Sequence, residues 1–196
     1  MSSKERKLKQ GMTNLDYENK RLLEVVTEDD EVVGAQTRTE VHRLGLLHRE
    51  VHVWMFDKDF NIIFQKRGLH ARSAGLLDAT AGGHVNQGED YLEAAVREME
   101  EETGISIATS DLILLGKLRG LEDKEKNLGL KINNFIRSVY IYKSPVNFQK
   151  IIKESGIPGG GFQKISKELL LKHDNIEVFM PFVFREEIPL VLKYIK

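Results

Sequence analysis

Three glutamates lie close together in the middle of the chain, and their carboxylates are candidates for binding a metal ion. Glu98, Glu101 and Glu102 lie within five positions, just before Gly104. On a helix they share one side of the last turns, where each like-charged pair costs roughly 0.2–0.5 kcal/mol. A carboxylate near a helix C-terminus loses roughly another 0.3–1 kcal/mol compared with a cation. A divalent cation would offset this repulsion, and hard carboxylate oxygens suit Mg²⁺ or Mn²⁺ better than Zn²⁺. The alternative is a solvent-exposed acidic face.

The segment that carries these glutamates has the pattern of an amphipathic helix. We predict a helix over 91–103, which ends at Gly104, where a left-handed backbone costs glycine little. Its apolar residues follow the i, i+3, i+4, i+7 spacing of a helix that packs on a core. They are Leu92, Ala95, Val96 and Met99.

A longer pattern surrounds the helix. It consists of Gly83, Glu89 six positions later, and the run REMEEETGI over 97–105. This pattern resembles the Nudix box, the loop–helix–loop signature of enzymes that hydrolyse diphosphates linked to another moiety. With each residue near ~7% of composition, seven matched polar or glycine positions have a chance probability on the order of 10⁻⁸ per starting point.

The resemblance implies a role for each matched residue. Glu98, Glu101 and Glu102 would face the metal, and the carbonyl of Gly82 would complete the metal shell. Glu98 and Glu101 are the expected catalytic carboxylates, and Glu98 is the one expected to orient or deprotonate the attacking water. Arg97 would pair with Glu89 and hold the helix against the preceding loop.

Other expected site residues lie outside the helix. The fourth carboxylate ligand is expected at Glu154, and Glu122, Asp123 and Glu125 compete for this role. Cationic and imidazole side chains before the helix are candidates for binding the diphosphate, although a solvent-exposed basic loop explains the cations equally well. These candidates are Lys66, Arg67, Arg72 and His84.

The stretch from Leu22 to Ile105 also resembles the Nudix branch related to isopentenyl-diphosphate isomerase, through "EVHRLGLLHREVHVWMFD" and "GLLDATAGGHV". His48 and His84 fall at metal-binding positions of that family, and His42 lies within about a residue of a third. For His42 and His48 we favour a structural role over metal binding. For His84 both interpretations stay open.

Three departures argue against isomerase chemistry. The acid–base cysteine of that family would stand at Gly82, and the chain has no cysteine at all. Two glutamates expected in a later strand are replaced by residues among Ile132, Asn133 and Asn134. Isomerase sequences typically match the Nudix box only incompletely, whereas in this chain the box is intact.

The composition limits the class of protein. The 196 residues have a net charge of −1, which gives no global field for nucleic acid or membrane. No segment approaches the ~20 apolar residues of a membrane span. We expect a cytoplasmic protein with a small-molecule diphosphate as partner, with neither nucleic acid nor membrane, and leave a homodimer open.

Two hairpins are expected in the first third of the chain, around "TEDD" (27–30) and around 57–59. Strands are expected over 112–118 and 131–142, a loop over 156–162, and helices over 166–173 and 184–196. Substrate specificity is expected from the first hairpins and from loops after Leu118 and Tyr142.

The predicted organisation is a flexible tail over 1–20 and a single Nudix hydrolase domain over 21–196, with the box at 83–105. The predicted fold class is α/β (α+β), a Nudix-type α/β/α sandwich with a mixed β-sheet and a loop–helix–loop catalytic motif. The predicted function is metal-dependent hydrolysis of a phosphoanhydride. The alternatives are a prenyl-diphosphate isomerase and a catalytically silent binding protein.

Overall fold

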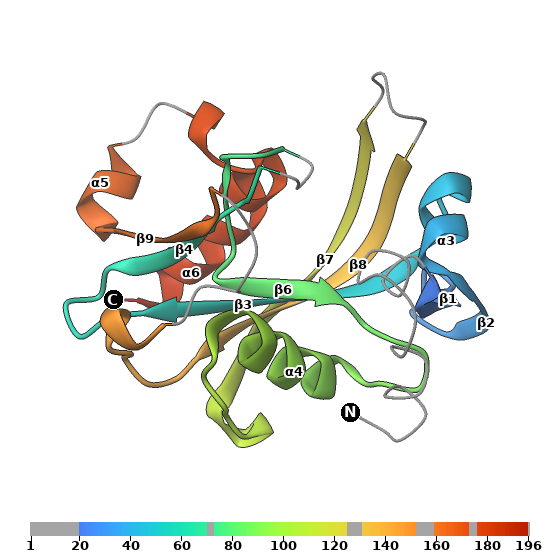
Figure 1. Ribbon diagram of the computed structural model, residues 1–196, viewed down its shortest axis with the longest axis horizontal. Coiled ribbons are helices and arrows are strands. Elements are labelled where there is room, and N and C mark those ends of the chain that lie inside the picture. Colours follow the sequence, from blue (N-terminus) through green and yellow to red (C-terminus); the bar gives the residue numbers. More distant parts are fainter. Residues whose placement is uncertain (1–19, 70–72, 125–130, 152–158, 173–175, 196) are drawn as a thin grey trace. The chain divides into compact units, whose positions relative to one another are not determined.

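The computed structural model describes residues 20–69, 73–124, 131–151, 159–172 and 176–195 (Figure 1). The predicted tail therefore lies outside the described residues, apart from its last position. The strands are β1 (Leu22–Val26), β2 (Val32–Thr37), β3 (His48–Phe56), β4 (Ile62–Lys66), β5 (Leu77–Asp78), β6 (Ala81–His84), β7 (Leu112–Lys124), β8 (Lys131–Tyr142) and β9 (Gly161–Ile165).

The helical elements alternate with these strands along the chain. The α-helices are α3 (Arg38–Leu44), α4 (Tyr91–Thr103), α5 (Lys167–Leu171) and α6 (Ile188–Tyr194). Short 3₁₀ turns occupy Thr109–Asp111, Phe148–Lys150 and Ile176–Val178, and a π-helical turn covers Val183–Glu187. Helices and a mixed sheet in one chain confirm the predicted α+β class.

Contacts within the chain define two compact units. Unit 1 comprises 20–49, 84–89 and 119–136, and unit 2 comprises 50–83, 90–118 and 137–195, within the described residues. The strands β3, β6, β7 and β8 contribute residues to both units. The single domain predicted over 21–196 stays a prediction.

Unit 1 contains the first predicted hairpin. β1 and β2 pair antiparallel from Leu22 opposite Thr37 to Val26 opposite Val32, and Asp30 turns the chain with φ 65°. β1 also pairs with the start of β3, at Val25 and His48.

The helix α3 of unit 1 was not predicted. Its N-cap is Thr37, whose hydroxyl accepts a hydrogen bond from the Glu40 N–H at 3.3 Å, and Gly45 ends it with φ 63°. The sequence contained this signal, because a threonine followed three positions later by glutamate, with a glycine beyond, is typical of a capped helix. α3 carries His42, and β3 begins at His48 directly after it.

Unit 2 contains the second predicted hairpin. β3 and β4 pair antiparallel at Met55–Ile63 and Phe56–Ile62. β4 also pairs with β9, from Ile62 opposite Ile165 to Lys66 opposite Gly161. The loop predicted over 156–162 is therefore wrong at its end, because Gly161 and Phe162 belong to β9.

The C-terminal predictions also fall within unit 2. The helix predicted over 166–173 is observed as α5, and Ser166 caps it with its Oγ accepting a hydrogen bond from the Leu169 N–H at 3.3 Å. The predicted final helix begins with the π-helical turn and continues as α6, with Pro189 in the first turn. β7 extends to Lys124, so the loop expected directly after Leu118 was wrong.

The hydrophobic core of unit 2 is built from β-strand side chains and from the C-terminal helical segment. Its largest members have little or no exposed area, and the alternation of β3 places Trp54 and Phe56 on the same face. Core residues include Trp54, Phe56, Ile62, Phe64, Val139, Ile141, Phe179, Val183, Ile188 and Val191.

α4 confirms the predicted helix, including both ends. The side chain of Asp90 accepts a hydrogen bond from the Glu93 N–H, and the Glu93 side chain accepts one from the Asp90 N–H, which makes a capping box. Gly104 ends the helix with φ 73°. The buried face differs from the predicted stripe, because Leu92 and Val96 are only half-buried. It consists of Ala94, Ala95, Glu98, Met99 and Thr103.

No helix in the described part of the chain is both long enough and apolar enough to cross a membrane.

Candidate functional site

The end of α4 and the glycines of β6 meet in unit 2. The Gly82 N–H donates a hydrogen bond to Oε2 of Glu102 at 2.9 Å. A side chain at Gly83 would overlap the carboxylate of Glu98, so this carboxylate lies directly against the backbone of β6. The fold thus places two of the predicted metal ligands beside the predicted backbone ligand, Gly82.

Arg97 supplies positive charge among the glutamates. Its Nη1 lies 2.6 Å from Oε1 of Glu98 and 3.3 Å from Oε2 of Glu101. Glu98 is buried, whereas 56% of the Glu101 side chain is exposed. Arg97 therefore offsets part of the like-charge repulsion on α4. The pair predicted between Arg97 and Glu89 stays a prediction, and the Glu89 carboxylate accepts a hydrogen bond from the Asn86 N–H at 3.0 Å.

The donors gathered here fit Mg²⁺ or Mn²⁺ in chemical type. Carboxylate oxygens from Glu98 and Glu102 and the backbone of Gly82 are hard ligands of the kind these cations prefer. Within the described residues, no three carboxylate groups have ligand atoms within 4.8 Å of one another. The three predicted carboxylate ligands of α4 are therefore not gathered around one point in these side-chain conformations.

The remaining predicted residues of this site are only partly described. Lys66 is exposed at the end of β4, and the Arg67 guanidinium forms an ion pair with the buried carboxylate of Asp78. Arg72 and Glu154 lie outside the described residues, as does Glu125. The alternatives Glu122 and Asp123 lie in β7, where Glu122 is half-buried.

A second candidate metal centre lies in unit 1. His42 of α3, His48 of β3 and His84 of β6 each present a ring nitrogen, and these three atoms all lie within 4.8 Å of one another. The His48 and His84 rings stack at 5.2 Å, and the His42 ring stands edge-on to both, at 5.1 and 5.0 Å. The structure therefore favours the metal-binding interpretation over the structural role expected for His42 and His48.

Hydrogen bonds to carbonyl groups select the tautomers of two of these rings. Nδ1 of His42 donates to the Ile132 carbonyl at 3.2 Å, and Nδ1 of His48 donates to the Leu46 carbonyl at 2.9 Å. In the neutral form each Nε2 then carries a lone pair, which is the arrangement that second-shell carbonyl groups impose on ligating histidines.

The spacing of the Nε2 atoms suits a transition metal. Nε2 of His42 lies 3.0 Å from Nε2 of His84, so without a metal His84 must supply the proton of this contact. Two nitrogens each about 2.1 Å from one tetrahedral cation would lie about 3.4 Å apart, only slightly further than these two. A cation could thus replace this proton, and three imidazoles suit zinc, iron, nickel or copper better than magnesium.

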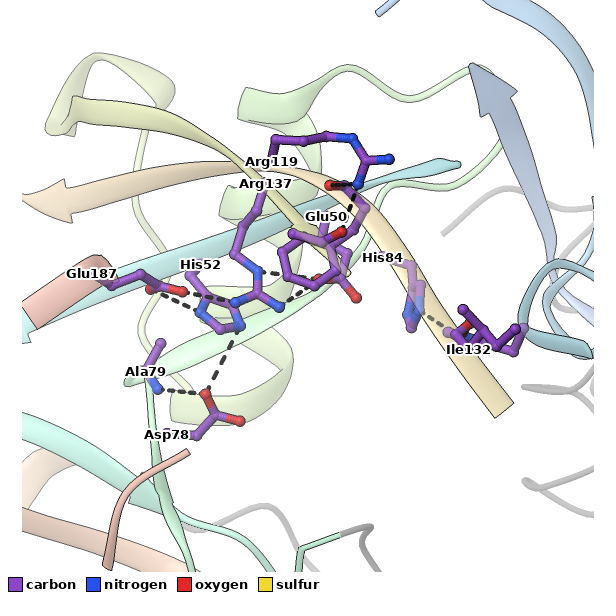
Figure 2. A network of polar contacts seen from close by, with 12 residues as sticks. Glu50, His52, Asp78, Ala79, His84, Arg119, Ile132, Arg137 and Glu187 are labelled. Carbon is purple, nitrogen blue, oxygen red and sulfur yellow. Dashed lines mark hydrogen bonds and ion pairs between the residues drawn. The ribbon is translucent and has the colours of Figure 1, made fainter. Parts of the chain in front are cut away.

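A buried polar network in unit 2 was not predicted (Figure 2). Nη1 of Arg137 lies 2.7 Å from Oε1 of Glu187, and Nη2 lies 2.6 Å from Oε2 of Glu50. Nδ1 of His52 and Nε1 of Trp54 lie 2.9 and 3.0 Å from Oε2 of Glu187. The alternation of Glu50, His52 and Trp54 on one face of an apolar strand was the available sequence signal.

Electrostatics explain why Glu187 can be ionised in this environment. Burial opposes the charged form, but the charges and hydrogen bonds of His52 and Arg137 outweigh it and lower the pKa of Glu187 to about 2. Burial also opposes the charged form of Arg137, but Glu50 and Glu187 raise the pKa of its guanidinium. The network therefore holds buried charges in alternating order.

Comparison with known proteins identifies the family of this chain. The family model described as NUDIX domain matches residues 46–162, which is more than half of the chain. The match includes both β6 and α4, and therefore the glycines and glutamates described above.

Curated relatives match over part of their length. An uncharacterised Nudix hydrolase of Clostridium acetobutylicum is 30% identical over 131 residues, which cover 65% of this chain and 61% of the relative. An isopentenyl-diphosphate Δ-isomerase of Serratia proteamaculans is 40% identical over 86 residues, covering 43% of this chain and 48% of the relative. The chain thus spans less than two thirds of either relative.

Solved structures share the fold. The crystal structure of DR0079 from Deinococcus radiodurans has a TM-score of 0.62 at 21% identity, over 89% of this chain and 98% of that one. The MutT protein of Methanosarcina mazei has a TM-score of 0.53 at 19% identity, over 76% of this chain and 96% of that one. At these identities the likeness concerns the fold alone.

Proposed function

Because this chain belongs to the Nudix domain family, we propose that it is a divalent-metal-dependent hydrolase. Its substrate would be a nucleoside diphosphate derivative or a similar small molecule that contains a phosphoanhydride bond. The observation that carries the proposal is the meeting of α4 with β6, where Glu98 and Glu102 lie against the backbone of Gly82 and Gly83. The glutamates lie 15 to 20 positions after the glycines in sequence, and Gly83, Glu98 and Glu102 belong to one intact motif.

The residues have separate parts in the proposed reaction. Bound Mg²⁺ or Mn²⁺ would neutralise phosphate oxygens and lower the pKa of a coordinated water. Glu98, Glu101 and Glu102 would hold the cation with the Gly82 carbonyl, and Glu98 would accept the proton of the attacking water. Arg97 would keep Glu98 oriented through its hydrogen bond at 2.6 Å. The exposed cation of Lys66 would attract the diphosphate.

The test is a panel of nucleotide and prenyl diphosphates incubated with the protein, with and without Mg²⁺, followed by identification of products. We expect new phosphorylated products only when Mg²⁺ is present, and ¹⁸O-labelled water would mark the attacked phosphorus. Glu101→Gln should remain folded but lose at least about 100-fold in kcat, because it removes one ligand charge from the metal.

Glu100→Gln is the matched control. Glu100 belongs to the same run of glutamates, is exposed, and accepts a hydrogen bond from the Ser106 hydroxyl at 3.0 Å instead of facing β6. We expect it to retain activity within about twofold, as exposed substitutions away from special features generally do. Equal activity in Glu101→Gln and Glu100→Gln would remove Glu101 from the site.

Two alternatives predict different products. An isomerase would cleave no phosphoanhydride bond and would give only an isomeric prenyl diphosphate, and this chain has glycine at position 82, where the acid–base cysteine of the isomerase family would stand. A catalytically silent binding protein would show only stabilisation by the ligand.

A further inference from the structure

The imidazole of His52 packs against the backbone of Gly82. A β-carbon added to Gly82 would overlap Cδ2 of His52 and would lie 3.0 Å from its Nε2. This edge of the ring therefore occupies the place where any other residue at position 82 would carry its side chain. The same glycine donates its N–H to Glu102.

A hydrogen bond to Glu187 orients the His52 ring, and the carboxylate of Asp78 lies near its other nitrogen. Nδ1 lies 2.9 Å from Oε2 of Glu187, and Nε2 lies 4.0 Å from Oδ1 of Asp78 (Figure 2). Glu187 is itself held by Trp54 at 3.0 Å and by Arg137 at 2.7 Å. Since these side chains are buried, the ring has little freedom to turn away from Gly82.

We propose that His52 is a positioning residue for the hydrolysis proposed above: its ring, oriented by Glu187, holds the Gly82 backbone where it meets the Glu102 carboxylate. The inference rests on the proposed function for its catalytic consequence only. His52 acts through Gly82 and Glu102 and does not touch substrate in this role.

A purely structural role would predict something different. Buried ion pairs contribute little net stability, because desolvation of the charges offsets their attraction. A network kept for stability alone would, when a donor is lost, loosen unit 2 in general, so that amide exchange would rise at Ile63 as much as at Gly82. A network that positions Gly82 is most sensitive at His52, whose ring packs on the glycine.

The test compares two variants that each alter one donor to the same Glu187 oxygen. His52→Asn keeps a nitrogen that can donate to Glu187 but removes the ring edge that packs on Gly82. Trp54→Phe removes one hydrogen bond to Glu187 but leaves the His52 ring in place. Far-UV circular dichroism establishes that each variant is folded.

The first readout is hydrogen exchange of the Gly82 amide, measured by NMR on the full chain without metal. The exchange rate is normalised to that of the Ile63 amide in β4, which reports on general loosening of unit 2. We expect His52→Asn to raise the normalised rate at least about tenfold and Trp54→Phe to change it less than about threefold, because local opening governs exchange.

The second readout is steady-state hydrolysis with saturating Mg²⁺. We expect kcat of His52→Asn to fall at least about tenfold with KM changed less than about threefold, since a small misplacement of ligands slows chemistry. Equal effects of the two variants on Gly82 exchange, or unchanged exchange in His52→Asn, would overturn the proposal.

Two measures keep the test decisive. If His52→Asn does not fold, Glu187→Gln replaces it, because this change keeps the shape of the side chain and removes the charge that orients His52. Increased normalised exchange at Gly82 supports the proposal, and unchanged exchange overturns it. If the wild-type protein hydrolyses no diphosphate, the proposed function fails, whereas the exchange comparison still decides whether His52 positions Gly82.

Discussion

At the scale of single residues, Asp57 holds the turn between β3 and β4. Its Oδ1 accepts hydrogen bonds from the N–H groups of Asp59 and Asn61, each at 3.0 Å, and its Oδ2 accepts one from Nζ of Lys164 at 2.9 Å. Burial opposes ionisation of this carboxyl group, but the hydrogen bonds from Asn61 and Lys164 prevail and lower its pKa from 3.8 to about 2.

Asp57→Asn is expected to lower the free energy of unfolding by about 1–3 kcal/mol at pH 7, because charged hydrogen bonds are lost at a buried site. A depressed folded-state pKa gives stability that is complete above the unfolded pKa and is lost as pH falls through the folded pKa. The difference in free energy of unfolding between wild type and variant should therefore shrink as the pH falls from 4 to 2. Urea titrations across this range measure it.

Asp59→Asn is the control for this prediction, since Asp59 pairs only at the surface, with the exposed Lys58. It should change stability little at any pH. If the difference in free energy of unfolding between wild type and Asp57→Asn stayed constant down to pH 2, this would contradict the ionised state of Asp57.

The histidine centre of unit 1 permits a second prediction at this scale. His84→Gln should weaken Zn²⁺ or Co²⁺ binding by about 10–100-fold or more, because one of three imidazole ligands is lost. Equilibrium dialysis with metal analysis measures the affinity. Glu101→Gln serves as the reciprocal variant, which should keep Zn²⁺ binding and lose hydrolysis. Undiminished Zn²⁺ binding in His84→Gln would show that the three rings are not a metal centre.

At the scale of elements, the capping box of Asp90 and Glu93 satisfies N–H groups at the start of α4, and the last turn of the helix contains no basic residue. Asp90→Ala should lower the free energy of unfolding by about 1 kcal/mol, since the Glu93 N–H loses its acceptor. Thermal unfolding followed by circular dichroism measures the change. Glu93→Gln preserves the reciprocal hydrogen bond and should destabilise the protein less than Asp90→Ala. A larger destabilisation by Glu93→Gln would mean that the charge of Glu93, and not the capping hydrogen bonds, stabilises the N-terminus of α4.

At the scale of the whole molecule, metal binding should be visible as stability. Excess Mg²⁺ at about 100 times its Kd should add about 2.7 kcal/mol to the free energy of unfolding, because the folded chain alone binds it. Midpoints measured in Mg²⁺ and in EDTA give this difference. The difference should be much smaller in Glu101→Gln and unchanged in Glu100→Gln; an equal Mg²⁺ effect in both variants would place the cation elsewhere.

Local patterns in the sequence were sufficient to predict much of α4. The apolar spacing and Gly104 predicted both ends of α4, and the glutamate spacing predicted which carboxylates share its last turns. These features depend on neighbours three or four positions apart, so the chain carries them wherever the helix packs. The predicted apolar stripe was partly wrong, because the packing of α4 set its buried face.

Only the tertiary structure brought distant residues together. His52 and Glu187 are 135 positions apart, and His42 meets His84 across 42 positions. No local spacing encodes such contacts, since they arise when strands pair and helices pack and when buried polar groups must find partners. Local patterns in the chain therefore predicted α4, the glutamates of its last turns and the family resemblance. Packing decided that a histidine ring would press on Gly82 and that three imidazoles would converge.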